Sequence, residues 1–205
     1  MYSVISASHQ TIIREIDPQY VAQYEWIREK VAEADSIQYQ REYKDFWRMN
    51  VAQLSKSFYA TYFGLLKASA PPTLPSLGQT LYESAIRRSG KRILPFSFAT
   101  KLLHIQNPHL PIYDSRVARF FLFEPPASDP PLQERIAKLT AFYEFLVAEY
   151  ARVINAGMLA PAIAAFRERF RPHHHTDEKI VDWLIWALVG LAEDGAVLNG
   201  RIVYS

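Results

Sequence analysis

The chain has 205 residues, of which 49% are hydrophobic and 21% are charged, and it contains no cysteine. This composition is that of an ordinary globular protein, and the length is sufficient for one well-buried domain. Without cysteine the chain can form neither a disulfide nor a cysteine-held iron–sulfur cluster. The net charge of +2 does not by itself indicate that the protein binds nucleic acid.

No N-terminal segment has the basic start and apolar run of a signal peptide. The most apolar stretch, residues 180–192, is interrupted by Asp182 and is shorter than the ~20 residues that span a bilayer. We therefore expect a cytoplasmic protein without a membrane partner.

The first third of the chain is expected to be mainly helical. After an extended start, apolar residues recur at helical spacing in three stretches, at about 18–34, 37–49 and 51–67. Many of these residues are aromatic, which favours a packed core over a surface for stacking bases.

The proline-rich segment 71–75 predicts a linker between two parts of the fold. After it, Ser76 is expected to cap a helix that runs to Arg88 and stops at Ser89-Gly90. A second proline-rich segment, residues 124–131, is too stiff to be a flexible tether.

The remainder of the chain also shows helical spacing, and helices are predicted at about 132–156, 161–170 and 177–192. The Asn199-Gly200 pair lies between two β-branched runs and predicts a small terminal hairpin. No internal repeat is visible, and the expected fold class is all-α.

The chain between Leu94 and Phe121 predicts two helices joined by a short turn. Leu94-Pro95 opens the first helix, and Asn107-Pro108 ends it, since the residue before a proline is pushed out of helical geometry. Asp114 is expected to cap the second helix. On the first helix Ser97, Lys101 and His104 are expected along a solvent-facing side, opposite an apolar face of Phe98, Ala99, Leu102 and Leu103.

Residues 94–121 resemble the helix-hairpin-helix DNA glycosylases, in which a Leu-Pro opens the hairpin and an aspartate begins the next helix. Residues 112–117, IYDSRV, match the second half of the family motif. The first half departs from it, because Phe96-Ser97-Phe98 stands where the family has Gly-x-Gly. The lysine of the lyase members would fall near Thr100, and Lys101 is one residue, or about 100° of helix, away.

The resemblance implies a two-lobed all-α fold and a DNA substrate. One lobe would hold about residues 1–70 and 158–205, and the other about residues 76–156. Since the chain has no cysteine, the cluster-free branch that includes the 8-oxoguanine enzymes is the nearest, and no cofactor is expected.

The resemblance also implies that Asp114 stabilises the positive charge that grows on the deoxyribose as the base leaves. The alternative is that Asp114 only caps a helix. Lys101 is a candidate Schiff-base nucleophile, with a phosphate contact or a solvated surface residue as alternatives. Tyr113, Asp182 and Trp186 are candidate pocket residues, and the alternative for Asp182 is a buried, hydrogen-bonded carboxylate.

Basic residues are concentrated in the segment 81–120, which has seven basic and two acidic residues. Charge of this kind is suited to the phosphates of double-stranded DNA, although a solvated helical face has the same pattern. The candidate DNA-binding residues are Lys91, Arg92, Ser97, Arg116 and Arg119.

Other motifs are weaker. Residues 173–175 are three consecutive histidines, but their spacing is not that of a zinc site, and no metal is predicted. The sequence has no phosphate-binding glycine loop and no hydrolase or metalloprotease motif. The rival hypothesis is a non-catalytic helical interaction protein that binds a protein partner.

Overall fold

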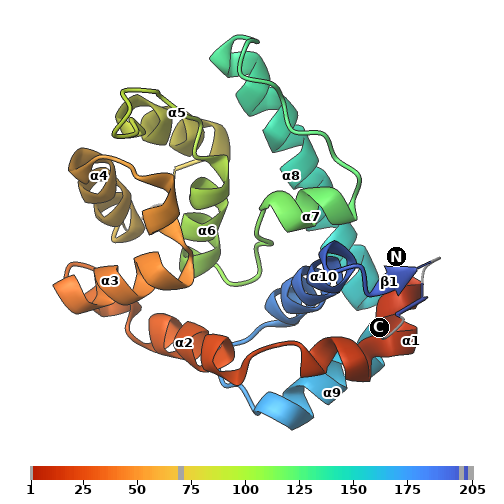
Figure 1. Ribbon diagram of the computed structural model, residues 1–205. Helices are drawn as coiled ribbons and strands as arrows, with labels where there is room; N and C mark the ends of the chain where they lie inside the picture. Colours follow the sequence, from red (N-terminus) through yellow and green to blue (C-terminus); the bar gives the residue numbers. More distant parts are fainter. Residues whose placement is uncertain (1, 69–71, 199–200, 203–205) are drawn as a thin grey trace.

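The computed structural model describes residues 2–68, 72–198 and 201–202, and their fold is all-α. Figure 1 shows α1 to α5 following one another around the outside of the molecule, with α6, α7 and α10 inside. The described residues form ten α-helices and two short 3-10 helices, α1 (Tyr2–Arg14), α2 (Pro18–Glu29), η1 (Val31–Glu33), α3 (Ile37–Phe46), η2 (Met49–Ala52), α4 (Lys56–Leu66), α5 (Leu74–Ser84), α6 (Phe96–Gln106), α7 (Ser115–Phe120), α8 (Leu132–Asn155), α9 (Ala160–Phe170) and α10 (Asp177–Glu193).

Side-chain caps begin many of these helices, as local sequence chemistry requires. The Asp17 carboxylate accepts a hydrogen bond from the Gln19 amide at 2.8 Å, directly before Pro18 in the first turn of α2. The Ser36 and Thr176 hydroxyls accept from amides three residues ahead. These caps satisfy amides that have no partner inside the helix.

The expected extended start is wrong, because residues 2–14 form α1. Ile5, Ile12 and Ile13 are fully or almost fully buried, at a spacing that brings them to one side of a helix. α1 packs against α9 and α10, which are far away in sequence. Tertiary packing therefore outweighs the low helix propensity of its serine and β-branched residues.

Two predicted helix boundaries are also wrong. The helix expected from Ser76 to Arg88 begins at Leu74, with Thr73 as its cap, and ends at Ser84. Residues 85–93 instead form a bridged loop, in which Ile86 pairs with Arg92. The loop ends the helix because its backbone bonds to another part of the chain.

The partner of that loop is the chain just before α4. Leu54 pairs with Arg87, and the Arg88 amide donates to the Gln53 carbonyl at 3.1 Å. Gln53 has a left-handed φ of 51°, which interrupts the helix expected from residue 51, so α4 begins at Lys56.

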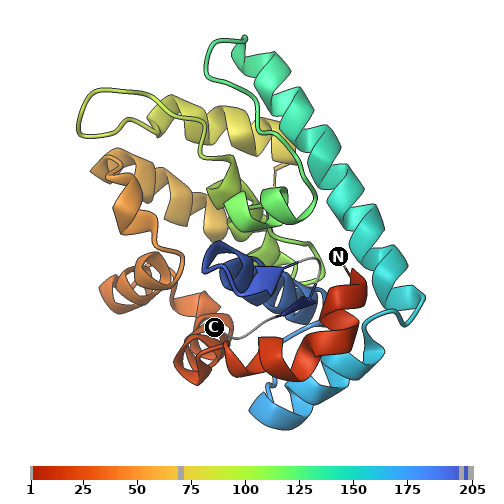
Figure 2. The same ribbon diagram turned by 45° about the vertical axis from the view of Figure 1, so that its right-hand side comes forward.

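The centre of the fold is α10, which packs against α1, α7, α8 and α9. Figure 2 shows α8 along one side of the molecule and α10 in the middle. On the other side, α4, α5 and α6 pack on one another. Nine of the eleven residues of α6 are buried, from Phe96 to Ile105 with Ser97 excepted.

The C-terminal segments Val197–Leu198 (β1) and Arg201–Ile202 (β2) pair in antiparallel fashion, and the predicted Asn199-Gly200 turn lies outside the described residues. Pro71, at the start of the predicted linker, lies outside them as well. Of the helices in the described ranges, none has the length and apolar character that crossing a membrane requires.

Candidate functional site

A cleft of about 610 Å³ lies where α3, η2, α6, α7 and α10 meet. Its walls are strongly aromatic, and it also holds five cationic side chains and two carboxylates. The aromatic lining consists of Tyr20, Phe46, Trp47, Phe96, Phe98, Tyr113, Trp183 and Trp186. The charged lining consists of Arg48, Lys101, Arg116, Arg135 and Lys179 with Asp114 and Asp182.

Asp114 has two functions in this geometry. Its Oδ1 accepts hydrogen bonds from the Arg116 and Val117 amides, each at 2.9 Å, and so caps α7. Its Oδ2 makes no hydrogen bond within the described ranges, and the residue lines the cleft. One oxygen therefore holds the helix while the other remains available to a ligand.

Lys101 is 8% exposed and lies in the cleft, so the expected solvent-facing side of α6 is wrong. Its ammonium group is 5.4 Å from the centre of the Trp47 ring. Burial lowers the pKa of Lys101, and the neighbouring Lys179 charge lowers it further, while the Asp114 and Asp182 carboxylates act in the opposite direction. These are the two conditions, desolvation and a nearby cation, under which an amine becomes a nucleophile.

His104, expected on the same solvent-facing side, is 1% exposed. Its Nε2 is 2.7 Å from the Tyr24 hydroxyl, and its Nδ1 is 2.6 Å from the Leu110 carbonyl oxygen. Burial lowers the pKa of His104 well below its ordinary value, so the ring is neutral. α6 is therefore buried on every side, and His104 serves to connect it to α2 and to the turn.

Thr100 fixes the position of Asp114. The Thr100 hydroxyl accepts a hydrogen bond from the Tyr113 amide at 3.1 Å and lies 3.3 Å from the Tyr113 carbonyl oxygen. Thr100 thus joins α6 to the residue directly before Asp114. Thr100, near which the resemblance would place a lysine, therefore has a structural role, and the neighbouring Lys101 is the side chain that lines the cleft.

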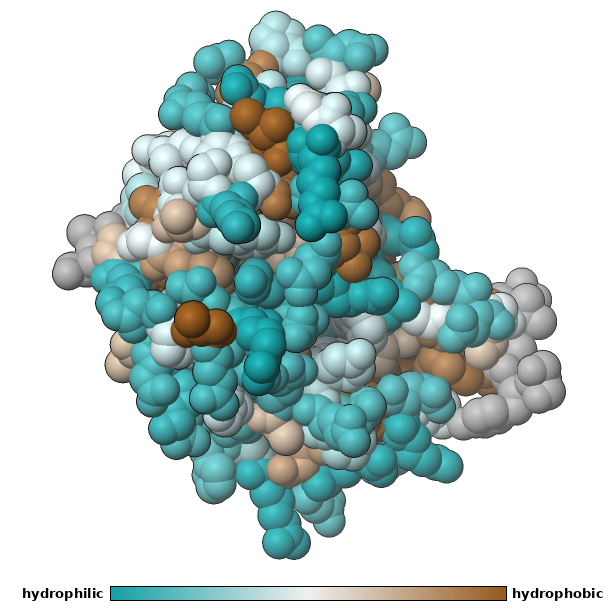
Figure 3. Space-filling view, turned by 60° about the vertical axis from the view of Figure 1, so that its left-hand side comes forward, coloured by the Kyte–Doolittle hydropathy of each residue, from teal (hydrophilic) through white to brown (hydrophobic). Residues whose placement is uncertain are grey.

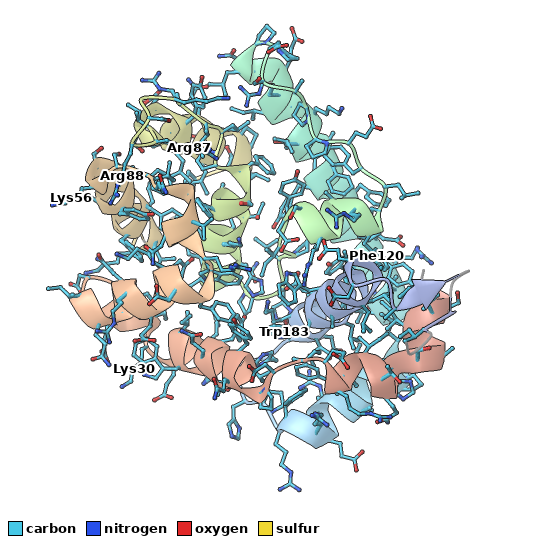
Figure 4. The ribbon with its side chains drawn as sticks, in the orientation of Figure 1. Lys30, Lys56, Arg87, Arg88, Phe120 and Trp183 are labelled. Atoms are coloured by element: carbon cyan, nitrogen blue, oxygen red, sulfur yellow. The ribbon has the colours of Figure 1, made fainter. Side chains whose placement is uncertain are left out.

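Lys179 and Asp182 form a buried ion pair in the cleft. The Lys179 ammonium donates to Asp182 Oδ2 at 2.6 Å, and the two residues are 2% and 6% exposed. Burial raises the pKa of Asp182, while the Lys179 charge opposes this. Figure 4 shows Trp183, next in the chain, near the centre of the molecule.

Arg116 lies at the edge of the cleft with its charge already paired. Its guanidinium is 3.8 Å from the centre of the Trp186 ring and 2.7 Å from the Glu193 carboxylate. Arg119 forms a second ion pair with the same carboxylate and does not line the cleft. Glu193 therefore reduces the positive potential that these arginines offer to a ligand.

The structure brings most of the candidate residues together. Those that line the cleft are Asp114, Lys101, Ser97, Arg116, Tyr113, Asp182 and Trp186. Lys91 and Arg92 lie outside it, exposed on the bridged loop 85–93. That loop pairs with Leu54, a few residues from Val51 at the rim.

Sequence reasoning missed Lys179, Trp183 and Trp47. A signal existed for the first two, because Lys179, Asp182, Trp183 and Trp186 follow the i, i+3, i+4, i+7 spacing of one helix face. Charged residues on the same face as two tryptophans in an otherwise apolar helix indicate a polar site. Trp47 had no such signal, because α3 is aromatic along its buried side.

The histidine loop contacts a carboxylate rather than a metal. The His173 and His174 amides donate to the Glu25 carboxylate, and His175 Nδ1 lies 2.5 Å from Glu25 Oε1. Within the described ranges, no group of three or more metal-ligating side chains is arranged to hold an ion.

Comparisons of the chain with protein-family models, with curated proteins and with solved structures found no match. The function is therefore inferred from the cleft itself.

Proposed function

We propose that the protein is a DNA glycosylase of the helix-hairpin-helix type, which cleaves the N-glycosidic bond of a damaged base flipped into the cleft. One observation carries this proposal: Asp114 and the buried Lys101 line the same aromatic cleft. Asp114 Oδ2 makes no hydrogen bond among the described residues. In this proposal the two lobes are residues about 1–70 with 158–205 and about 76–156, and both contribute to the cleft wall.

The size and lining of the cleft support a nucleobase as the ligand. About 610 Å³ lies within the range of small-molecule sites, and a flipped base is normally held between aromatic side chains. Trp47, Trp183 and Trp186 are among the aromatic residues that line the cleft.

The chemistry follows from the two catalytic candidates. As the N-glycosidic bond breaks, its electron pair leaves with the base and positive charge grows on the sugar. The Asp114 carboxylate offsets that charge. A water molecule, or the Lys101 amine in its neutral form, then forms the new bond at C1′ of the sugar and loses a proton, while the departing base takes up a proton from solvent.

An exposed basic surface supports binding to the DNA backbone. It consists of Lys56, Arg87, Arg88, Lys91 and Arg92, and none of them forms an ion pair within the described ranges. Figure 4 shows Lys56, Arg87 and Arg88 grouped at one side of the molecule, away from Phe120. The view in Figure 3 shows a mostly hydrophilic face with apolar residues only in small groups. Phosphates are the natural partners of such unpaired cations.

The test is excision from duplexes that each carry one damaged base, with the wild type beside Asp114→Asn. Asparagine retains a capping oxygen and removes the charge, so we expect excision to fall at least about a hundredfold, the usual loss for one electrostatic catalytic group. Asp17→Asn is the matched control, because Asp17 caps α2 in the same manner and does not line the cleft.

The outcomes separate the two hypotheses. Excision that survives Asp114→Asn would reject Asp114 as the catalytic carboxylate. Salt-sensitive DNA binding without excision of any lesion would leave a non-catalytic DNA-binding protein, and no binding at all would favour the protein-partner hypothesis.

A further inference from the structure

Four residues that line the cleft each have a buried polar atom without a hydrogen-bond partner among the described residues. They are Asp182 Oδ1, the indole nitrogens of Trp183 and Trp47, and Arg135 Nε. A buried polar atom without a hydrogen bond destabilises the fold, so the four in the wall of this cleft point to a polar ligand that bonds to them.

Asp182 is the hydrogen-bond acceptor in this set, and Lys179 fixes its orientation. The Lys179 ammonium donates to Oδ2 at 2.6 Å, which leaves Oδ1 to accept from a ligand. Both side chains are more than nine-tenths buried, so the pair does not exchange its bonds readily with water.

The surroundings of Lys179 hold its ammonium group in place. It lies 4.5 Å from the centre of the Trp183 ring, 5.2 Å from that of Trp47 and 5.1 Å from that of Tyr24. The ammonium has three N–H donors, and Asp182 is its only hydrogen-bond acceptor within the described ranges. It can therefore donate to a ligand oxygen beside Asp182.

We propose that Lys179 and Asp182 are specificity-determining residues that read a nucleobase edge carrying an N–H donor beside a carbonyl oxygen. Asp182 Oδ1 accepts from the ring N–H, and the Lys179 ammonium or the Trp183 indole N–H donates to the carbonyl. The tryptophans stack on the ring. This inference rests on the proposed function, since it names the class of base that the cleft accepts.

The probes are 2′-deoxyinosine and 1-methyl-2′-deoxyinosine, titrated against the wild-type protein by quenching of tryptophan fluorescence. The first has a single N–H on its base, next to the carbonyl, and methylation removes that donor. We expect methylation to weaken binding about tenfold or more, the usual loss for a hydrogen bond to a charged group. Three of the four tryptophans line the cleft, so the signal reports on it.

The variant is Lys179→Met with Asp182→Leu. Changing Asp182 alone would leave a buried ammonium unpaired and risk unfolding, whereas replacing both by apolar residues of similar volume is often neutral. The double variant keeps the shape of the site, so a steric clash with the methyl group would persist in it. We expect it to bind both nucleosides with affinities within about twofold of each other, because stacking remains and the hydrogen bonds are gone.

The inference is wrong if the wild type binds the two nucleosides equally or binds neither. It is also wrong if the double variant still prefers 2′-deoxyinosine to its methylated form. The titration requires no catalysis and is therefore independent of the excision assay. If the wild type prefers 2′-deoxyinosine but excises no lesion, the glycosylase proposal is rejected and the base-reading site stands. Excision by a wild type that shows no preference would reject this inference alone.

Discussion

Burial changes the chemistry of Lys101. On the periodicity of its helix this residue belongs to a solvent-facing side, but the helix packs against α4 and α5, and its His104 contacts Tyr24 of α2. Its amine therefore lies near Lys179 in an aromatic cleft, and burial lowers its pKa. A sequence contains neither fact, because both depend on neighbours distant in the chain.

The lowered pKa predicts how Lys101 reacts. If its amine attacks the sugar, borohydride should trap a covalent complex with lesion-containing DNA, and the trapping rate should rise with pH to a plateau whose midpoint lies below the ordinary 10.5. Lys101→Met should abolish trapping, while Lys67→Met, which changes an exposed lysine paired with Asp35, should not. Excision without any trapped complex would instead identify water as the nucleophile.

His104 predicts how stability depends on pH. Burial keeps its folded-state pKa well below the 6.5 of an ordinary histidine, so the unfolded chain binds its proton first as the pH falls. Stability is therefore complete above about pH 6.5 and decreases below it, by up to about 1.4 kcal/mol per pH unit for one proton.

The measurement is urea unfolding of the wild type and His104→Gln at pH 7 and pH 5. His104→Gln should reduce the pH dependence of the free energy of unfolding, although part remains because burial also lowers the pKa of His175 to about 4. An equal pH dependence in both proteins would contradict the neutral state of buried His104.

At the scale of secondary structure, the connection between α6 and the segment before α7 determines where Asp114 lies. That connection is the Thr100 hydroxyl, which bonds to the Tyr113 backbone. Thr100→Val keeps the shape of the side chain and leaves the Tyr113 amide without its partner. We expect a loss of about 1–3 kcal/mol of stability and a further loss of excision, because Asp114 follows Tyr113 directly.

Thr140→Val is the matched control, since the Thr140 hydroxyl is buried without a hydrogen-bond partner within the described part of the chain. Removing this hydroxyl should leave the free energy of unfolding unchanged or increase it. Thermal unfolding and the excision assay are measured on both variants. Equal effects of the two substitutions would show that Thr100 has no special part in positioning Asp114.

The helices themselves were predictable where local chemistry defines them. α2 and α10 begin where predicted, because Asp17 and Thr176 are good caps. The predictions are wrong where contacts with distant chain segments determine the secondary structure. α1 is helical because it packs on α9 and α10, and α5 ends early because the loop after it bonds to Gln53.

At the scale of the whole molecule, ion pairing decides which basic residues of segment 81–120 have an unpaired charge for the proposed DNA ligand. Arg116 and Arg119 are paired with Glu193, whereas Arg87 and Arg88 have no ion pair within the described ranges. The basic surface defined above therefore lies toward α4 and α5 rather than over α7.

Arg87→Gln with Arg88→Gln should weaken binding to duplex DNA regardless of sequence and flatten the salt dependence by about two phosphate contacts. Arg169→Gln with Arg171→Gln is the control, because it removes the same charge at the end of α9. The measurement is affinity for an undamaged duplex at several salt concentrations. Equal losses in both double variants would indicate an effect of net charge rather than a docking surface.

The all-α class, most helices and Asp114 as the cap of α7 follow from sequence alone, because periodicity and capping are local properties. The cleft shared by Asp114, Lys101 and the Lys179–Asp182 pair follows from tertiary packing, as do the ion pairs of Glu193 with two of the predicted DNA-binding arginines. Proximity, burial and the resulting pKa values arise when distant segments of the chain are packed together, as with Lys101 and Lys179, which are 78 residues apart.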